Sequence, residues 1–179
     1  GDSDIAMEHL FWAETAKEVN LQELANERGE GDFDAPRNDV NEKLRVGYWS
    51  PDFRGHSVNY FFKPLILNHD KDKVETYLYH DSFISDDQTD SIKEAADHFF
   101  DVYLLNDVEL MRLMRSHQLD VLVELAGHTS MNRLVLFKGN RFAPLQITGI
   151  GYPPTTGLSE VDAKIVDPYV VGPHPEQFY

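Results

Sequence analysis

Short apolar segments alternate with segments of helical character from Leu44 onwards, and this alternation is the feature that most restricts the fold. The apolar segments predict strands at 44–49, 74–80, 100–104, 119–125, 145–149 and 163–166, and the segments between them predict helices at 57–68, 87–98, 107–117 and 130–138. Alternation at this spacing is typical of a parallel sheet with right-handed crossovers and helices on both faces. The predicted fold class is therefore α/β.

A separate helix is predicted ahead of this domain, over residues 3–28. One face of it collects mostly apolar side chains at alternating spacings of four and three residues: Ile5, His9, Trp12, Ala16 and Val19. Such a face, with Phe11 beside it, indicates docking onto a domain, or onto an element that is missing from this chain. Residues 29–43 are polar and contain Gly, Pro, Asn and Asp, which predicts a linker. We therefore divide the chain into an N-terminal helix with linker, 1–43, and an α/β domain, 44–179.

The C-terminal segment lacks the signals that close a domain. Pro168, Pro173 and Pro175 interrupt it, and residues 175–179 predict neither a closing strand nor a helix. We expect the chain to be one part of a longer protein.

One loop stands out at the end of the first predicted strand, in the stretch Ser50–Ser57. It places Asp52, Gly55 and His56 between a strand and a helix, at the sheet edge where ligands bind in open α/β sheets. A carboxylate and an imidazole four residues apart can share one small site, and Ser57 is the predicted N-cap of the helix. A plain turn, with Asp52 capping backbone and His56 merely exposed, is the alternative.

Two further polar, glycine-containing loops are predicted on the same edge. Gly127–Ser130, which includes His128, follows the strand at 119–125, and Gly149–Gly157 follows the strand at 145–149. Glycines permit close approach to a ligand, and the exposed hydroxyl and N–H groups suit a phosphate or a sugar. A rigid structural turn for 151–157 and a capping role for His128 are the alternatives. The coincidence of three such loops favours a binding site.

Composition excludes several classes of function. The net charge of −15, from 31 acidic and 16 basic residues, argues against a nucleic-acid or anionic-membrane partner. The absence of cysteine excludes disulfides, cysteine-ligated zinc and thiol nucleophiles. No signal peptide and no apolar run of about 18 residues is found, so the expected location is the cytoplasm.

Motifs for metals and nucleotides are also missing. The remaining histidines show no ligand spacing with carboxylates: His69, His80, His98, His117 and His174. The group Asp86, Asp87 and Asp90 fits a cation site, but fits a solvated helix start better. No P-loop and no Gly-x-Gly-x-x-Gly follows the first strand, which counts against nucleoside-triphosphate and dinucleotide folds. We expect neither a metal nor another cofactor.

The three loops, taken in order, resemble the catalytic region of the O-linked N-acetylglucosamine transferases, most closely the bacterial SPINDLY-like members. The resemblance rests on the segments 44–56, 127–133 and 141–157, and covers roughly residues 44–179. Residues 7–19 resemble the helix that joins the family's tetratricopeptide repeats to its catalytic region. The resemblance implies a GT-B architecture, in which this chain is the Rossmann-like N-terminal lobe. The C-terminal lobe, which supplies most UDP contacts in the family, and the upstream repeats would be absent.

The resemblance also implies roles for individual residues. His56 and Asp52 match the family's Asp-Phe-x-x-His motif and would be catalytic. Ile150 and Gly151 match positions whose backbone contacts the sugar. The rest of the expected substrate-binding set lies in the same two loops, without a specific contact carried over: Tyr152, Pro153, Thr155, Thr156 and His128. Pro154, Arg54-Gly55 and Ser57 depart from the commoner family pattern, which bears on sugar specificity.

The expected function is that of an inverting glycosyltransferase that moves N-acetylglucosamine from UDP to Ser or Thr hydroxyls of a protein, without a metal. The fragment alone is expected to be inactive, because half of the cleft would be missing. The runner-up hypothesis is a non-catalytic, flavodoxin-like binding module with the N-terminal helix as a docking arm. A related transferase that uses another sugar or an Asn acceptor is a third.

Overall fold

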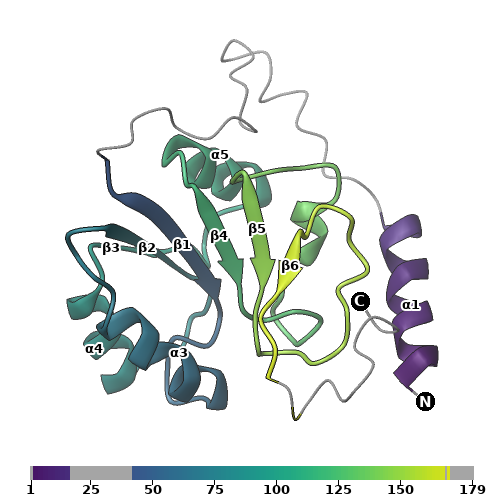
Figure 1. The fold of residues 1–179 in the computed structure, drawn as a ribbon, viewed down its shortest axis with the longest axis horizontal. Helices are drawn as coiled ribbons and strands as arrows, with labels where there is room; N and C mark the ends of the chain where they lie inside the picture. Colours follow the sequence, from purple (N-terminus) through teal and green to yellow (C-terminus); the bar gives the residue numbers. More distant parts are fainter. Residues whose placement is uncertain (1, 17–41, 168, 170–179) are drawn as a thin grey trace.

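The computed structural model describes residues 2–16, 42–167 and 169. Their elements are, in order, α1 (Asp2–Thr15), β1 (Leu44–Ser50), α3 (Ser57–Leu67), β2 (Val74–His80), α4 (Asp87–Ala95), β3 (His98–Asp101), α5 (Asp107–Ser116), β4 (Val121–Glu124), the 3-10 helix η1 (Leu134–Phe137), β5 (Leu145–Thr148) and β6 (Ala163–Lys164) (Figure 1). The predicted continuation of the first helix to residue 28, and most of the predicted linker, lie outside the described residues.

The described strands form one parallel sheet in the order β3-β2-β1-β4-β5-β6. The chain first moves outward from β1 to β3, then crosses back to β4 and moves outward in the other direction (Figure 1). The order therefore reverses between β1 and β4, and the loops after these two strands diverge there. In open α/β sheets this switch point is where ligands bind. The predicted α/β class and Rossmann-like sheet are confirmed.

Successive side chains of the strands point to opposite faces of the sheet, so the apolar core has two layers. Val46 and Tyr48 of β1 pack with the apolar residues of α3 and α4, such as Phe62. Trp49, the next residue of β1, points to the opposite face and packs with α5 and η1, for example against Phe137. Successive side chains of a strand point to opposite faces, so a strand buried on both sides must be apolar throughout. The expectation of helices on both faces is confirmed.

Several predicted elements are shorter in the structure: the helix at 87–98 ends at Ala95, and the strands at 119–125 and 163–166 are Val121–Glu124 and Ala163–Lys164. Two others differ more. The helix expected over 130–138 is only the short η1, because the Asn132 side chain closes the preceding turn: its amide donates to the carbonyl of Thr129 at 2.6 Å and its oxygen accepts the Leu134 N–H at 3.1 Å. The strand expected over 100–104 is instead β3, which pairs with the last four residues of β2. The apolar periodicity of a sequence shows neither a turn that a side chain closes nor the pairing of one strand with another.

The helix starts explain the acidic group noted above. Asp86 is the N-cap of α4 and forms a capping box with Thr89. The same carboxylate accepts the N–H of Gly55 at 2.7 Å, so it also ties the loop after β1 to α4. The preferred interpretation of Asp86, Asp87 and Asp90 as a helix start is confirmed.

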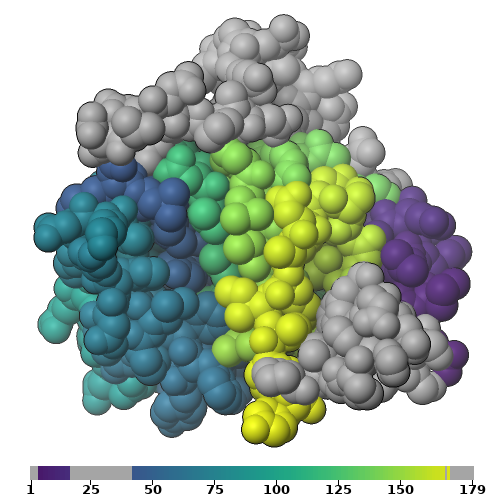
Figure 2. Space-filling view, in the orientation of Figure 1, coloured from purple at the N-terminus to yellow at the C-terminus, as the bar shows by residue number. Residues whose placement is uncertain are grey.

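Helix α1 packs at the β6 side of the domain (Figures 1 and 2). Ala6 and Ala13 are buried and Trp12 packs against the core layer of α5 and η1, so the predicted docking is confirmed. The predicted face is partly wrong: Ile5 is 37% exposed, and Phe11 is 67% exposed. The buried stripe includes Ala6 and Ala13 instead, and the domain approaches the helix closely at Gly157, where an added Cβ would lie 2.5 Å from the carbonyl oxygen of His9. None of the described helices is both long and apolar enough to cross a membrane.

Candidate functional site at the switch point of the sheet

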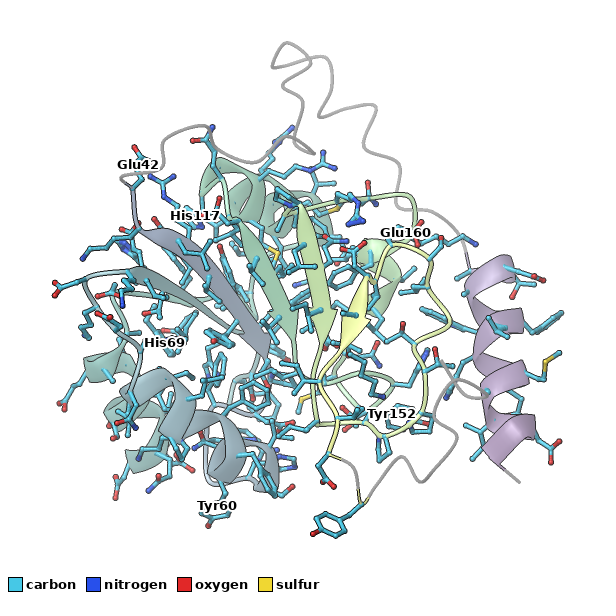
Figure 3. The ribbon with its side chains drawn as sticks, viewed as in Figure 1. Glu42, Tyr60, His69, His117, Tyr152 and Glu160 are labelled. Carbon is cyan, nitrogen blue, oxygen red and sulfur yellow. The ribbon has the colours of Figure 1, made fainter. Side chains whose placement is uncertain are left out.

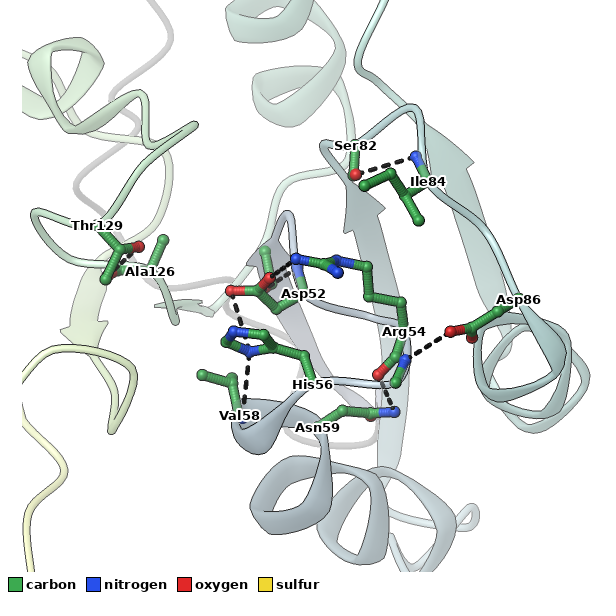
Figure 4. Close-up of polar contacts among 12 residues, drawn as sticks. Asp52, Arg54, His56, Val58, Asn59, Ser82, Ile84, Asp86, Ala126 and Thr129 are labelled. Atoms are coloured by element: carbon green, nitrogen blue, oxygen red, sulfur yellow. Dashed lines mark hydrogen bonds and ion pairs between the residues drawn. The ribbon is translucent and has the colours of Figure 1, made fainter.

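Asp52, Arg54 and His56 form a connected group in the loop after β1 (Figure 4). The two oxygens of the Asp52 carboxylate have different partners: Oδ1 accepts from the Arg54 guanidinium at 3.1 Å, and Oδ2 lies 3.4 Å from Nδ1 of His56. The Asp52 side chain is 8% exposed and that of His56 is 37% exposed. A buried, anchored carboxylate therefore supports an imidazole that solvent and substrates can reach. The structure brings together the two residues predicted to be catalytic.

His56 has a second role, as the N-cap of α3. Its Nδ1 accepts the N–H of Val58 at 3.4 Å, and its backbone is extended. The prediction that Ser57 is the N-cap was wrong, because Ser57 is already the first helical residue. The two contacts of Nδ1 belong to different proton positions: it accepts the Val58 N–H only when it carries no proton, whereas a proton on Nδ1 would point to Asp52 and leave Nε2 free to accept.

Hydrogen bonds hold the loop around Asp52 in place. The Asp52 N–H donates to the hydroxyl of Ser50, which is fully buried, at 3.0 Å. The Asn59 amide, from the first turn of α3, donates to the carbonyl of Arg54 at 2.8 Å. Both ends of the loop are thus tied to regular elements. The N-terminus of α3, with the partial positive charge of its N–H groups, lies at the same edge.

The loop after β4 is built on Glu124, a residue that the sequence analysis missed. Its carboxylate accepts the N–H of Ala126 at 2.7 Å and that of Gly127 at 2.9 Å, and the hydroxyl of Thr148 lies 3.4 Å away. Burial raises the pKa of Glu124 to about 7, although these hydrogen bonds oppose the shift. The available signal was a glutamate inside the otherwise apolar run of a central strand. Figure 4 shows Ala126 and Thr129 of this loop opposite Asp52 and His56.

The loop after β5 comes close to both of the others. A Cβ atom built on Gly151 would lie 1.8 Å from the carbonyl oxygen of Leu125 and 3.3 Å from Val58. Ile150 packs partly buried against the core layer of α3 and α4. Only glycine allows this contact with protein backbone. The predicted close approach of this loop to a ligand stays a prediction. The structure thus brings Ile150 and Gly151 next to the start of α3, which carries His56.

Other predicted substrate-binding residues contact helix α1. The His128 ring stacks on that of His9, with centroids 3.9 Å apart and an angle of 7° between the planes. His128 Nε2 donates to the carbonyl of Thr156 at 2.9 Å, and His9 Nε2 lies 3.0 Å from the Tyr152 hydroxyl. Figure 3 shows Tyr152 on the side of the domain where α1 lies.

These contacts give His128 and Tyr152 a packing role against α1. Burial lowers the pKa of His9 and of His128, and the proximity of His128 lowers the pKa of His9 further. Thr155 and Thr156 accept backbone N–H groups of the same loop. Pro153 is exposed. Contact between these residues and a substrate stays a prediction.

Lys164 is a second residue that the sequence analysis missed. It ends β6 in register with Thr148, which is itself in register with Glu124. Its ammonium group donates to three consecutive carbonyls, of Tyr152 at 2.7 Å, Pro153 at 2.6 Å and Pro154. Burial lowers the pKa of Lys164 to about 8, while the neighbouring Glu124 acts to raise it.

Three of the histidines without an expected role contact side chains of the sheet, whereas His80 Nε2 donates to the carbonyl of Ile84 at 3.1 Å. His69 lies 2.7 Å from the Tyr48 hydroxyl, and His117 lies 2.7 Å from the Tyr79 hydroxyl (Figure 3). His98 contacts Glu75 at 2.9 Å, and His174 lies outside the described residues. Within residues 2–16, 42–167 and 169, no three His, Asp or Glu side chains are grouped to hold a metal ion.

The comparison with protein families agrees with this geometry. The profile of Glycosyl transferase family 41 matches residues 24–176. The chain belongs to glycosyl transferase family 41. The resemblance noted from the three loops is thereby confirmed.

Relatives of this family 41 chain are found among plant and bacterial proteins. A Hordeum vulgare protein named "Probable UDP-N-acetylglucosamine--peptide N-acetylglucosaminyltransferase SPINDLY" is 37% identical over 142 residues, which are 77% of this chain and 15% of that protein. Its Arabidopsis thaliana namesake is 36% identical over 143 residues, or 78% of this chain and 16% of the relative.

A solved structure of a Thermobaculum terrenum O-GlcNAc transferase mutant superposes with a TM-score of 0.81 and 31% sequence identity, over 99% of this chain and 32% of that one. The family 41 chain therefore spans about a third of that structure, and an even smaller share of the two plant relatives. The fold expected from the resemblance is confirmed.

Proposed function

We propose that this chain is the N-terminal lobe of an inverting glycosyltransferase that moves N-acetylglucosamine from UDP to Ser or Thr hydroxyls of proteins. The observation that carries the proposal is the Asp52–His56 pair at the switch point of the sheet, in a chain of family 41. The names of the plant relatives supply the donor and the acceptor class. The test below also distinguishes a closely related transferase that uses another sugar donor.

Inverting transfer requires that the acceptor hydroxyl lose its proton as it attacks the anomeric carbon. His56 is exposed enough to reach that hydroxyl through Nε2, and Asp52 stabilises the imidazolium that results, at 3.4 Å from Nδ1. The diphosphate leaves with the electrons of the broken C–O bond and needs positive charge nearby. Arg54 is already bound to Asp52, so we assign diphosphate binding to a second lobe. No divalent metal takes part in this scheme.

The proposal also covers partners and location. A C-terminal lobe would close the cleft over the loops after β1, β4 and β5, and tetratricopeptide repeats upstream would present the acceptor protein to α1. The chain alone would then transfer no sugar. We also propose a cytoplasmic location, which fractionation of cells that produce the full-length protein tests.

The test is sugar transfer from UDP-N-acetylglucosamine to protein by a full-length protein containing both lobes, with His56→Ala and with Lys73→Ala as a surface control. We expect wild type and control to transfer equally, with and without EDTA, and His56→Ala to lose about a hundredfold or more in kcat, as removal of an acid–base group typically causes. Equal rates for His56→Ala and wild type would refute the catalytic assignment. If the protein transfers sugar only from another nucleotide sugar, the proposed donor is wrong. If it transfers none, a binding module is favoured.

A further inference from the structure

Three side chains form a polar row across the carboxyl ends of β4, β5 and β6. Glu124 pairs in register with Thr148, and Thr148 pairs in register with Lys164. Side chains in register on neighbouring parallel strands point to the same face of the sheet, so the three lie side by side. Their partners are backbone groups of the two loops beyond, because Glu124 binds N–H groups after β4 and Lys164 binds carbonyls after β5.

The loop after β5 depends on Lys164 for a chemical reason. The three carbonyls that it binds are consecutive, and consecutive carbonyl dipoles that converge on one point repel one another unless a cation lies there. Pro153 and Pro154 have no N–H, so the turn cannot be closed by amides at these two positions. The Lys164 ammonium group supplies three donors at the place where the backbone offers none.

The surroundings of Lys164 favour this single arrangement. The nearby Glu124 acts to raise the pKa of Lys164, whereas burial and, to a lesser extent, Lys164 itself lower the pKa values of His9 and His128. Lys164 is partly buried, and with a pKa lowered to about 8 it remains mostly charged at neutral pH. A cation that is held here at an electrostatic cost must make interactions that offset the cost, and its three carbonyl contacts do so.

We propose that Lys164 is a positioning residue: by gathering the carbonyls of Tyr152, Pro153 and Pro154 it fixes the loop after β5, and so holds Ile150 and Gly151 where the donor sugar binds beside His56. The contact of Gly151 with Leu125 and Val58 transmits this order to the loops after β4 and β1. The functional part of this inference rests on the proposed function, whereas the ordering of the loop does not.

The first experiment measures amide hydrogen exchange in this chain for wild type, Lys164→Met, Lys164→Arg and Lys73→Met. Lys73 is a matched control, because its side chain is 80% exposed and pairs locally with Asp70. We expect Lys164→Met to speed exchange at least tenfold in residues 149–157 and less than twofold in β1 and β2, with Lys164→Arg intermediate. Unchanged exchange in 149–157, or an equal rise throughout the sheet, would overturn the proposal.

The second experiment measures donor KM and kcat separately in the full-length transferase. Loss of loop order weakens ground-state binding of the sugar, so Lys164→Met should raise the donor KM at least tenfold with kcat changed less than threefold, and Lys164→Arg should recover part of the loss. A donor KM equal to that of wild type, together with faster loop exchange, would refute the link to sugar binding. Absence of transfer by wild type would instead refute the proposed function and leave the exchange result to decide the loop-ordering part.

Discussion

A Cβ atom on Gly151 would lie 1.8 Å from the carbonyl oxygen of Leu125, which is far inside any allowed contact. The loop after β5 and the end of β4 therefore touch backbone to backbone. This contact joins two loops that are 26 residues apart in the chain, since Leu125 precedes Gly151 by 151 − 125 = 26 positions. It sets the spacing at the edge where His56 lies.

Gly151→Ala should separate these two loops. The obstacle is main chain, which cannot rotate away as a side chain can, so we expect a loss of about 2 kcal/mol or more in the free energy of unfolding. For a chain of this size, that corresponds to a decrease in Tm of about 4–8 °C. Thermal unfolding checks it, with Gly55→Ala as control, because a methyl group there meets only the Asp86 carboxylate at 3.1 Å. Equal Tm values for the two variants would contradict the prediction.

Asp52→Asn should impair transfer without unfolding the chain. The substitution removes the charge that Arg54 binds and that stabilises a protonated His56. We expect kcat to fall about a hundredfold or more, as loss of a carboxylate that orients a catalytic histidine does. Steady-state kinetics of the full-length protein measures this. Asp70→Asn, which changes an exposed carboxylate before β2, serves as the control and should leave kcat unaltered.

Glu124→Leu and Glu124→Gln should differ strongly in stability. Leucine leaves the buried N–H groups of Ala126 and Gly127 without an acceptor, at a cost of about 1–3 kcal/mol for each. Glutamine keeps one acceptor oxygen and should cost much less. Urea unfolding at one pH distinguishes the two, and similar losses would show that the carboxyl oxygens do not organise the loop.

The raised pKa of Glu124 also predicts a pH dependence. In the folded chain this pKa is about 7, whereas an unfolded glutamate has a pKa of about 4.3. The native state therefore holds a proton that the unfolded state has lost, so the contribution of Glu124 to stability falls as pH rises from about 4.3 to about 7 and is constant above that. The difference in unfolding free energy between wild type and Glu124→Gln, measured from pH 4.5 to 8, should follow this curve. A difference independent of pH would refute the shift.

The His9–His128 stack predicts a dependence of the opposite sign. The pKa of both histidines is lowered in the folded chain, so the unfolded chain binds more protons as pH falls below about 6.5. Their stabilising contribution is complete above that pH and is lost progressively as pH falls through the folded pKa values. His9→Phe keeps a ring against His128 but cannot be protonated, so its unfolding free energy should fall less than that of wild type between pH 7.5 and 5.5. Parallel curves for the two proteins would contradict this.

The sequence by itself determined the sheet and the polar loops at its edge. A strand such as β1 must be apolar on both faces when helices cover both. Its continuous apolar run can therefore be recognised in the sequence without knowledge of any tertiary contact. Asp52 and His56 were also readable, because their separation is short and both lie in the loop after one strand. Local patterns failed where side chains close turns on themselves: Asn132 shortened the predicted helix at 130–138, and His56 took the N-cap position expected of Ser57.

Only the tertiary structure decided which distant groups meet. Glu124 and Lys164 are 164 − 124 = 40 positions apart in the chain. The fold brings them near each other because both are in register with Thr148 of β5, which lies between their strands. Nothing in the local sequence specifies that register, or that His9 stacks on His128. Burial then changed the chemistry of these groups, raising the pKa of Glu124 and lowering that of Lys164. Desolvation is a property of the whole fold, so neither the partners nor the charge states of these residues are encoded in any short segment of the chain.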